Sequence, residues 1–271
     1  MNLLVTLNEA NIPILRVMLY SLLKNNPSET FDLYLLHSRL NGQNLQEIRR
    51  GFDPVRLRLH AVSAGDTALA GAQTSSRYPV EIYYRLFAAQ YLPESVSRIL
   101  YLDPDIIVLQ SLRPLYDTDL KGKWIAGACH TSAVVQVFND IRLHTPGGVY
   151  INSGVLLMDL EGLRRGQDPD QLLAYIRKHR GRMMLPDQDV LNALYADRIV
   201  PVDPLVYNMT ERLMALCNDE ENGFRIDPGW VAEHTAVIHY CGRNKPWKKD
   251  CIGRLGSFYR QYRQELEERS I

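Results

Sequence analysis

Two apolar patterns alternate along the N-terminal part of the chain. Short runs of β-type residues occupy residues 3–6 and 31–36, and residues 55–62 alternate apolar and basic side chains, as a half-exposed strand does. Between these runs, residues 14–25 and 45–52 carry apolar side chains at helical spacing. The order strand, helix, strand, helix, strand predicts an open α/β sheet that is parallel at this end.

The remaining segments continue this alternation. The pattern predicts further strands at residues 98–102, 124–128, 149–159 and 236–240. It predicts further helices at residues 82–91, 171–179, 188–195 and 255–268. Residues 149–159 are nearly all apolar, which suits a central strand covered on both faces. Residues 203–228 show neither pattern, and we expect irregular chain there that covers a site.

The chain is long enough for one well-buried core. At 271 residues we expect one α/β domain over residues 1–252, followed by a C-terminal helix over residues 253–271. Lys plus Arg and Asp plus Glu both number 31, so no net charge favours nucleic acid or a membrane surface.

Features of the N-terminus and the cysteines indicate a cytoplasmic protein. The first residues lack the basic segment of a signal peptide, and the apolar residues 12–23 are interrupted by Arg16 and fall short of the ~20 that a membrane span needs. The four cysteines form no Cys-x-x-Cys pair, so we expect reduced thiols, with a Cys241–Cys251 disulfide as the alternative.

Two carboxylates follow the apolar run that ends at Leu102. Asp103 and Asp105 are two residues apart on an extended chain, so both can point to one side and converge on one cation. Pro104 restrains Asp103 to an extended conformation, which supports this geometry. The alternative is a solvated turn, where Asp-Pro-Asp is common.

A second candidate lies at residues 239–247. His239 precedes Gly242, which permits close backbone approach to an anion, and Lys245, which can reach a phosphate as a point charge. An imidazole beside two carboxylates is a ligand set that suits Mn²⁺, with Mg²⁺ as the alternative. A lone histidine on a short strand is more often structural, but this combination is typical of a metal-bound diphosphate site.

Two further polar groups adjoin apolar segments. Asn152 enters the most apolar strand, where its amide needs a partner such as a sugar hydroxyl or a neighbouring backbone group. Asp187, Gln188 and Asp189 open a helix, and capping alone explains one acid there but not the whole run.

Taken in order, five segments of the chain resemble the family-eight glycosyltransferases. They are Tyr83-Tyr84-Arg85-Leu86, Leu100-Tyr101-Leu102-Asp103-Pro104-Asp105, Tyr150-Ile151-Asn152-Ser153-Gly154-Val155-Leu156-Leu157, Asp187-Gln188-Asp189, and His239-Tyr240-Cys241-Gly242 through Lys245-Pro246-Trp247. The resemblance extends from Leu3 to Cys251. It implies the GT-A fold, with an open, mostly parallel central sheet flanked by helices, as in glycogenin and in bacterial lipooligosaccharide galactosyl- and glucosyltransferases.

The resemblance also implies roles for individual residues in a retaining enzyme. It makes Asp103, Asp105 and His239 the ligands of Mn²⁺. It implies phosphate contacts from Gly242 and Lys245. It implies contacts to the donor sugar from Arg85, Asp103, Asn152, Gly154, Asp187 and Gln188, with Asp189 lining the sugar and acceptor side. Gln188 and Asp187 are the implied catalytic residues, and Gln188 lies below the anomeric carbon.

One segment departs from the family pattern. The family often places an acidic residue and an asparagine after the first strand, whereas residues 7–11 read Leu-Asn-Glu-Ala-Asn. Asn8 still offers both a donor and an acceptor to a uracil edge. A UDP-sugar is therefore the expected donor, and a saccharide or glycolipid in cell-surface glycan or lipopolysaccharide synthesis is the expected acceptor.

Two other functions fit parts of the pattern. A haloacid-dehalogenase-like phosphatase also places Asp-x-Asp after an apolar strand, but normally near the N-terminus. A catalytically inactive UDP-sugar-binding protein would keep the same pocket, although every expected ligand type is present here.

The sequence indicates less about the residues that contact the acceptor and about the role of the C-terminal helix than about the donor site. Tyr207, Met214 and Phe224 are apolar candidates for the acceptor side, with ordinary packing as the alternative. Some relatives dock on membranes through a basic, aromatic tail, but here the acidic Glu265, Glu267 and Glu268 argue against that contact.

Overall fold

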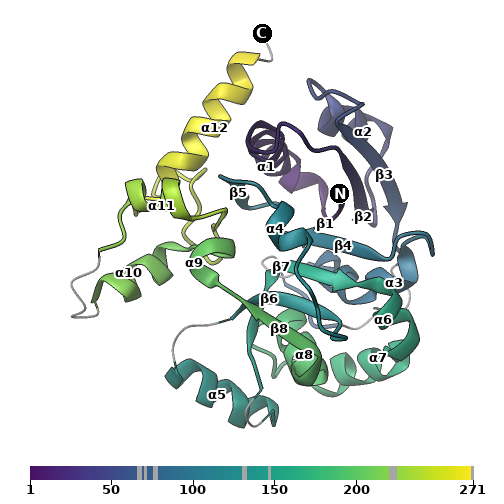
Figure 1. The fold of residues 1–271 in the computed structure, drawn as a ribbon. Coiled ribbons are helices and arrows are strands. Elements are labelled where there is room, and N and C mark those ends of the chain that lie inside the picture. The colour runs from purple at the N-terminus through teal and green to yellow at the C-terminus, as the bar shows by residue number, and fades with distance from the viewer. Residues whose placement is uncertain are drawn as a thin grey trace.

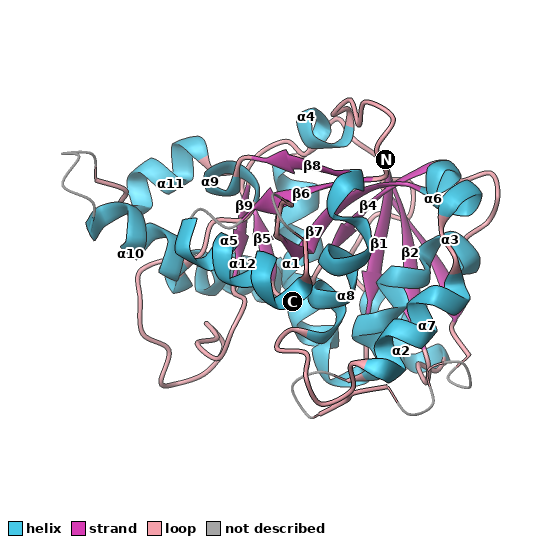
Figure 2. Ribbon diagram, turned by 90° about the horizontal axis from the view of Figure 1, so that it is seen from below, coloured by secondary structure: helices cyan, strands magenta, loops and turns pink. Residues whose placement is uncertain are grey.

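The core of the molecule is a twisted seven-stranded sheet. The computed structural model describes residues 1–65, 69, 72–75, 79–129, 133–145, 148–219 and 225–269. The strand order is β3-β2-β1-β4-β7-β6-β8. The bounds are β1 Asn2–Thr6, β2 Phe31–His37, β3 Leu57–Ser63, β4 Arg98–Leu102, β6 Ile125–Cys129, β7 Ile151–Asp159 and β8 Ile199–Val202. Figure 2 shows these strands fanning across the molecule between the helices.

The N-terminal half of the sheet is parallel, as the sequence predicts. Strands β1, β2, β3 and β4 run in one direction, and the crossovers between β1, β2 and β3 are the helices α1, Ile12–Asn25, and α2, Gly42–Arg49. Parallel neighbours need such crossovers because a tight turn can join only antiparallel strands. Strand β7 runs antiparallel to both β4 and β6, so the sheet is mixed and mostly parallel.

The reversed direction of β7 brings its first residues to the edge where β4 ends. Leu102 pairs with Val155, and the Asp103 amide donates to the Gly154 carbonyl at 2.8 Å. The small antiparallel ribbon of β5, Ile106–Val108, and β9, Val237–His239, continues from this edge. Three parts of the chain that are distant in sequence, residues 98–108, 151–155 and 237–239, therefore meet at one edge of the sheet.

Both faces of the sheet are buried, and successive residues alternate between them. On one face Leu100 and Leu157 pack with α1. On the other face Tyr101 and Leu156 pack with α7, Pro169–Lys178, and α8, Pro186–Tyr195. This alternation follows from the two-residue period of a strand and explains why β7 is apolar throughout.

The C-terminal helices pack on the outer side of α1. They are α10 Glu211–Asp219, α11 Pro228–His234 and α12 Gly256–Arg269, and they share a third core with β5 and β9. Lys24 contacts Glu265 at 2.6 Å, and the rings of Tyr20 and Tyr262 meet edge to face. Figure 1 shows α12 lying beside α1. The C-terminal helix therefore packs on the domain that precedes it.

Several sequence-based predictions need correction. Residues 203–228 are not irregular, because they contain α9, Pro204–Tyr207, α10 and the start of α11, while Phe224 lies outside the described residues. The signals that were overlooked are Asp203 and Asp227, whose side chains cap helices that begin with proline.

Other elements differ in type or were not predicted. The segment predicted as a helix at residues 82–91 is mostly the 3-10 helix η2, Val80–Phe87, followed by the short α3, Ala88–Tyr91. The pattern also did not predict β5, β8 or five further helices outside residues 203–228. Those helices are η1 Glu9–Asn11, α4 Arg113–Tyr116, α5 Ala133–Leu143, α6 Leu160–Gly166 and η3 Ala196–Arg198.

Among the described residues, no helix has the length and apolar character required to cross a membrane.

We predict that Leu157→Ala destabilises the fold by about 2–5 kcal/mol, because its side chain is 0% exposed in the middle of the sheet and truncation leaves a cavity. Urea unfolding followed by tryptophan fluorescence measures the free energy of unfolding. Val55→Ala is the matched control, since its side chain is 71% exposed and the change should stay within about 0.5 kcal/mol. Equal stabilities for the two variants would contradict the assignment of β7 to the core.

Candidate active site

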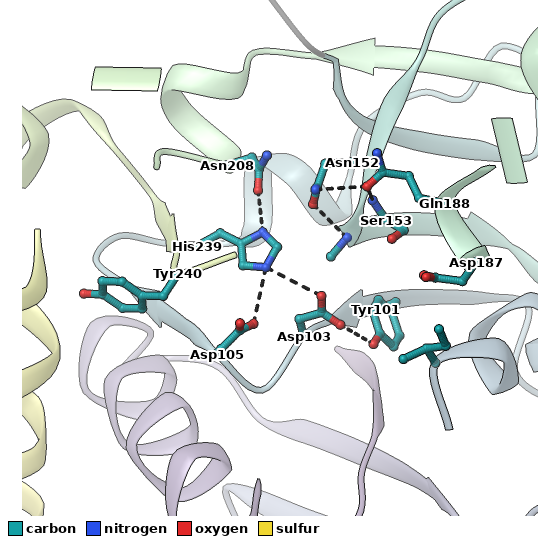
Figure 3. A network of polar contacts seen from close by, with 12 residues as sticks. Tyr101, Asp103, Asp105, Asn152, Ser153, Asp187, Gln188, Asn208, His239 and Tyr240 are labelled. Carbon is teal, nitrogen blue, oxygen red and sulfur yellow. Dashed lines mark hydrogen bonds and ion pairs between the residues drawn. The ribbon is translucent and has the colours of Figure 1, made fainter. Parts of the chain in front are cut away.

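The polar side chains predicted from the sequence gather at the edge where β4 ends and β7 begins. Figure 3 shows Asp103, Asp105 and His239 facing one another. Asp103 follows β4, Asp105 precedes β5, and His239 is the last residue of β9. Pairing of Ile106 with His239 carries the imidazole to the two acids. Buried strands deliver each side chain, so the arrangement is rigid.

The three side chains form one potential metal-binding group. His239 Nε2 lies 3.5 Å from Asp103 Oδ2 and 3.3 Å from Asp105 Oδ1. The ligand atoms of all three residues lie within 4.8 Å of one another. Two carboxylates and an imidazole are suitable ligands for Mn²⁺. The structure therefore brings together the triad that the sequence predicts from two distant segments.

Gly154 makes room for this group. A Cβ atom at residue 154 would lie 2.2 Å from His239 Cε1 and 2.8 Å from Asp103 Oδ2. Such distances are far inside van der Waals contact, so one or both ligands would have to move. Glycine is required at position 154 because any side chain there would collide with His239 and Asp103, and not because of its backbone conformation.

Asn208 orients the imidazole and was not predicted from the sequence. His239 Nδ1 lies 2.8 Å from Asn208 Oδ1, and both side chains are buried. An amide oxygen only accepts, so Nδ1 donates its proton and Nε2 is directed at the two acids. Backbone bonds between Met209 and β9 hold the two segments together. The one sequence signal for Asn208 is that it lies within residues 203–228, which we expected to cover a site.

Each carboxylate of the pair uses one oxygen for a protein cation and turns the other toward His239. Arg85 Nη1 lies 2.9 Å from Asp103 Oδ1, and the Tyr101 hydroxyl donates to the same oxygen at 2.5 Å. Lys245 Nζ contacts Asp105 Oδ2 at 2.5 Å. Oδ2 of Asp103 and Oδ1 of Asp105 thus face the shared space.

These contacts determine which groups are charged. Burial would raise the pKa of the Asp103 carboxyl, but Arg85 and His239 hold that pKa below its ordinary value. Burial opposes ionisation of Asp105 in the same way, and His239 and Lys245 overcome it and lower its pKa. Burial lowers the pKa of His239, but Asp105 and Asp103 raise it to about 10. Nε2 must give up this proton before it can coordinate a cation.

Arg85 links the triad to α8. Its guanidinium is almost fully buried, stacks 4.2 Å above the Tyr101 ring, donates to the Ser153 carbonyl at 2.8 Å and lies 3.4 Å from Asp187. Burial raises the pKa of the Asp187 carboxyl, and the charge of Arg85 opposes that rise. One cation thus positions Asp103 and Asp187.

Gln188 and Asp187 carry buried polar atoms without a hydrogen-bond partner in the described protein. Gln188 Oε1 accepts from Asn152 Nδ2 at 3.1 Å and from the Ser153 amide at 3.2 Å, which fixes the side chain. Gln188 Nε2 makes no hydrogen bond in the described protein, and Asp187 Oδ2 makes none although it lies 3.4 Å from Arg85 Nε. Because buried polar groups are normally satisfied, these two atoms mark a place where a polar ligand fits.

Asp189 is engaged differently. Both oxygens of its fully buried carboxylate accept from Arg142, at 2.6 and 2.7 Å, and Tyr150 and the Met184 amide also donate to it. These contacts tie α5 to α8. A direct contact of Asp189 with a donor sugar stays a prediction.

The remaining predicted residues lie around the same edge. Asn8 follows β1 and accepts from Asn11 at 3.1 Å. Lys245 also donates to the Tyr240 carbonyl at 2.8 Å, which places it beside the triad. Gly242 has a φ of 96°, in the region that favours glycine. The nucleoside and phosphate contacts of these residues stay predictions.

We predict that Gly154→Ala lowers the affinity for Mn²⁺ roughly 100-fold, the order expected when a ligand is displaced by about 1 Å. Isothermal titration calorimetry measures that affinity. Gly42→Ala is the matched control, because its added Cβ meets nothing within 4 Å. Unchanged Mn²⁺ affinity in Gly154→Ala would show that the triad does not hold the ion.

Loss of the Asn208 amide should weaken Mn²⁺ binding by about 10–100-fold, because the imidazole loses the partner that fixes its tautomer and orientation. Asn208→Ala tests this by the same titration. Asn208→Asp keeps an acceptor for Nδ1 and should retain most of the affinity. If both variants bind equally well, His239 is oriented by its strand alone.

Comparisons with known proteins identify the family to which the chain belongs. The family model described as glycosyl transferase family 8 matches residues 2–251. The chain is 27% identical over 248 residues to a lipopolysaccharide 1,2-glucosyltransferase of Escherichia coli K12, covering 90% of this chain and 72% of that protein. It is 25% identical over 237 residues to general stress protein A of Bacillus subtilis, covering 86% and 82%.

Solved structures show the same fold. The crystal structure of the galactosyltransferase LgtC in complex with donor and acceptor sugar analogs matches with a TM-score of 0.83 and 23% identity, covering 98% of this chain and 96% of that chain. Mouse xyloside xylosyltransferase 1 matches with a TM-score of 0.60 and 21% identity, covering 89% and 97%. The fold is GT-A-like, and the chain belongs to glycosyl transferase family 8.

Proposed function

We propose that this protein is a retaining, Mn²⁺-dependent hexosyltransferase that moves galactose or glucose from a UDP-sugar to a saccharide or glycolipid acceptor. The observation that carries the proposal is the group of three potential metal ligands, Asp103, Asp105 and His239. Gly154 leaves the space that this group occupies, and the chain belongs to a glycosyltransferase family. The named activities of similar proteins, a lipopolysaccharide glucosyltransferase and a galactosyltransferase, support a role in cell-surface glycan or lipopolysaccharide synthesis.

Cleavage of the bond between the sugar and UDP leaves negative charge on the diphosphate. A bound Mn²⁺ supplies Lewis-acid stabilisation of that charge, with Mg²⁺ as the alternative ion. Lys245 lies beside Asp105, from where its ammonium group can donate to a phosphate oxygen. Gly242 leaves its backbone accessible to the same anion, and Asn8 offers its amide to the uracil edge.

The sugar would lie between Arg85, Asn152 and the first turn of α8. Gln188 Nε2 and Asp187 Oδ2 are the buried polar atoms that sugar hydroxyls or the ring oxygen can satisfy. Arg85 keeps Asp187 in place, and Asn152 keeps Gln188 in place. The donor side of the site is therefore organised before a substrate binds, which is the condition for effective electrostatic catalysis.

Retention of configuration at the anomeric carbon requires either two successive displacements or attack by the acceptor from the face that the leaving group vacates. Gln188 is a poor nucleophile because its amide oxygen bears no full charge. Asp187 is held by Arg85, which lowers its nucleophilicity. We therefore favour front-face attack, with the departing phosphate oxygen accepting the proton of the acceptor hydroxyl.

The cysteines fit this proposal. No disulfide joins Cys241 and Cys251 in the described structure, so the alternative bridge is not formed there. Free thiols are the rule in cytosolic proteins, and we propose a cytoplasmic reaction.

The decisive test is UDP release from UDP-glucose and UDP-galactose, with Mn²⁺ and with a chelator. We expect turnover of one donor that depends on Mn²⁺, and a loss of roughly 100-fold or more in Asp103→Ala, about 2.7 kcal/mol of transition-state stabilisation. Asp197→Ala removes an exposed carboxylate and serves as the matched control.

UDP binding without turnover across both donors and a panel of acceptors would instead support a catalytically inactive UDP-sugar-binding protein. Wild-type turnover in Asp103→Ala would remove Asp103 from the site.

A further inference from the structure

Helix α5 exposes an apolar face at the side of the active site. Val137, Phe138 and Ile141 are 57%, 53% and 72% exposed, and their spacing places them on one side of the helix. Met184 is 60% exposed. These are four of the seven large apolar side chains that are exposed in the described part of the chain. Such clustering differs from the single exposed apolar residues that are normal on a soluble surface.

Met184 is tied to the same side of the molecule. Its amide donates to Asp189 Oδ2 at 2.8 Å, and Arg142, the residue after Ile141, donates to that oxygen at 2.6 Å. Phe138 lies against the Arg142 guanidinium. One buried carboxylate thus holds the end of α5 and the segment before α8 together.

A basic turn adjoins this apolar face. Arg177, Lys178, His179, Arg180 and Arg182 fall within six residues, and residues 171–186 contain no acidic side chain. The chain as a whole balances 31 basic against 31 acidic residues, so this concentration is local. No ion pair with an acidic residue is present for these four Lys and Arg side chains within the described ranges.

A shared pocket shows that the two features are neighbours. A pocket of about 290 Å³ is lined by Arg142, Leu143 and His144 at the end of α5, and by Tyr175, His179, Arg182 and Met183. Burial, together with the charges of Lys178 and Arg182, lowers the pKa of His179. The pocket therefore lies between the end of α5 and the basic turn, at the border of the apolar surface.

We propose that the face formed by Val137, Phe138, Ile141, Met184 and the turn at residues 177–182 docks on a membrane surface of anionic lipids. Exposed apolar side chains beside a cluster of Lys and Arg are typical of a protein surface that lies in the lipid interface. The pocket at their border suits a lipid phosphate group.

A second copy of the chain fits this face poorly. A symmetric dimer would use this patch on both copies and so bury both basic turns in one interface, while residues 171–186 contain no acidic side chain to pair with them. The C-terminal helix is also a poor membrane contact, because it carries Glu265, Glu267 and Glu268 and lies at the opposite end of the molecule from α5 in Figure 1.

Docking at this face has a consequence for the acceptor, which rests on the proposed function. Helix α5 is joined to the active-site segments, since Gln136 accepts from the Tyr150 amide at 3.1 Å and Arg142 binds Asp189, the neighbour of Gln188. Seating α5 on lipid would hold this side of the site at the membrane surface. The acceptor class that fits is a saccharide on a lipid anchor.

Vesicle sedimentation of the full-length protein tests the proposal. Vesicles of phosphatidylcholine mixed with phosphatidylglycerol should bind the wild type, binding should fall as salt is added, and vesicles of phosphatidylcholine alone should bind roughly tenfold less. Phe138→Ser/Ile141→Ser and Lys178→Glu/Arg180→Glu should each lower binding to the anionic vesicles by roughly tenfold or more.

Matched control variants distinguish a loss of binding at the proposed face from the effect of changing any exposed apolar or basic side chain. Ile252→Ser changes an apolar side chain that is 78% exposed elsewhere, and Lys121→Glu/Arg260→Glu reverses two exposed charges elsewhere. Both should bind like the wild type, and thermal melting confirms that all variants fold. UDP release from the donor in the absence of lipid should be unchanged in the α5 and turn variants, so a failure of the proposed enzyme activity is visible separately.

Failure of the wild type to bind anionic vesicles would overturn the proposal. Equal binding by the wild type and both double variants would also overturn it. A dimer in light scattering that the Phe138→Ser/Ile141→Ser change converts to a monomer would assign the face to a second copy instead.

Discussion

Two carboxylates and an imidazole share a buried corner of this protein, and the surrounding structure keeps that concentration of charge in place. Two acids at such short range would repel, and burial would favour their neutral forms. Arg85 on one side and Lys245 on the other each bind one oxygen of the pair, which leaves the facing oxygens and His239 Nε2 around one space. The charge balance and the geometry thus have one origin.

Arg85 connects this electrostatic balance to the rest of the site. It belongs to η2, yet it contacts Asp103 after β4, the Ser153 carbonyl in β7 and Asp187 in α8. A buried arginine is tolerated only where carboxylates and carbonyls satisfy it, so its loss would leave several partners unpaired at once. Arg85, which pairs with Asp103, therefore also fixes the first turn of α8, where the buried polar atoms of Asp187 and Gln188 lie.

Residue patterns and the family resemblance together named most of the candidate site, but neither named Asn208. Asp103 and Asp105 follow an apolar strand two residues apart, so strand alternation places both on one side, whereas Gly154 was named from the family resemblance. Asn208 lies after a one-turn helix in a segment expected to be irregular, and its contact with His239 depends on a backbone bridge between Met209 and Ile238. Local pattern carries no information about such a bridge. The phosphatase alternative also arose from local pattern, and the family match over residues 2–251 removes it.

The metal-binding candidates and the flank beyond Asp189 are held in place in different ways. Asp103, Asp105 and His239 lie at the ends of β4, β5 and β9, whose pairing is set by backbone bonds. The flank beyond Asp189 consists of α5 and the segment before α8, and it is held by hydrogen bonds such as those to the Asp189 carboxylate. Side-chain contacts of this kind can change with few substitutions while the strands stay the same. Under the proposed function, this region is where we expect related enzymes to differ in their acceptors, because surface helices carry specificity at little cost to the core.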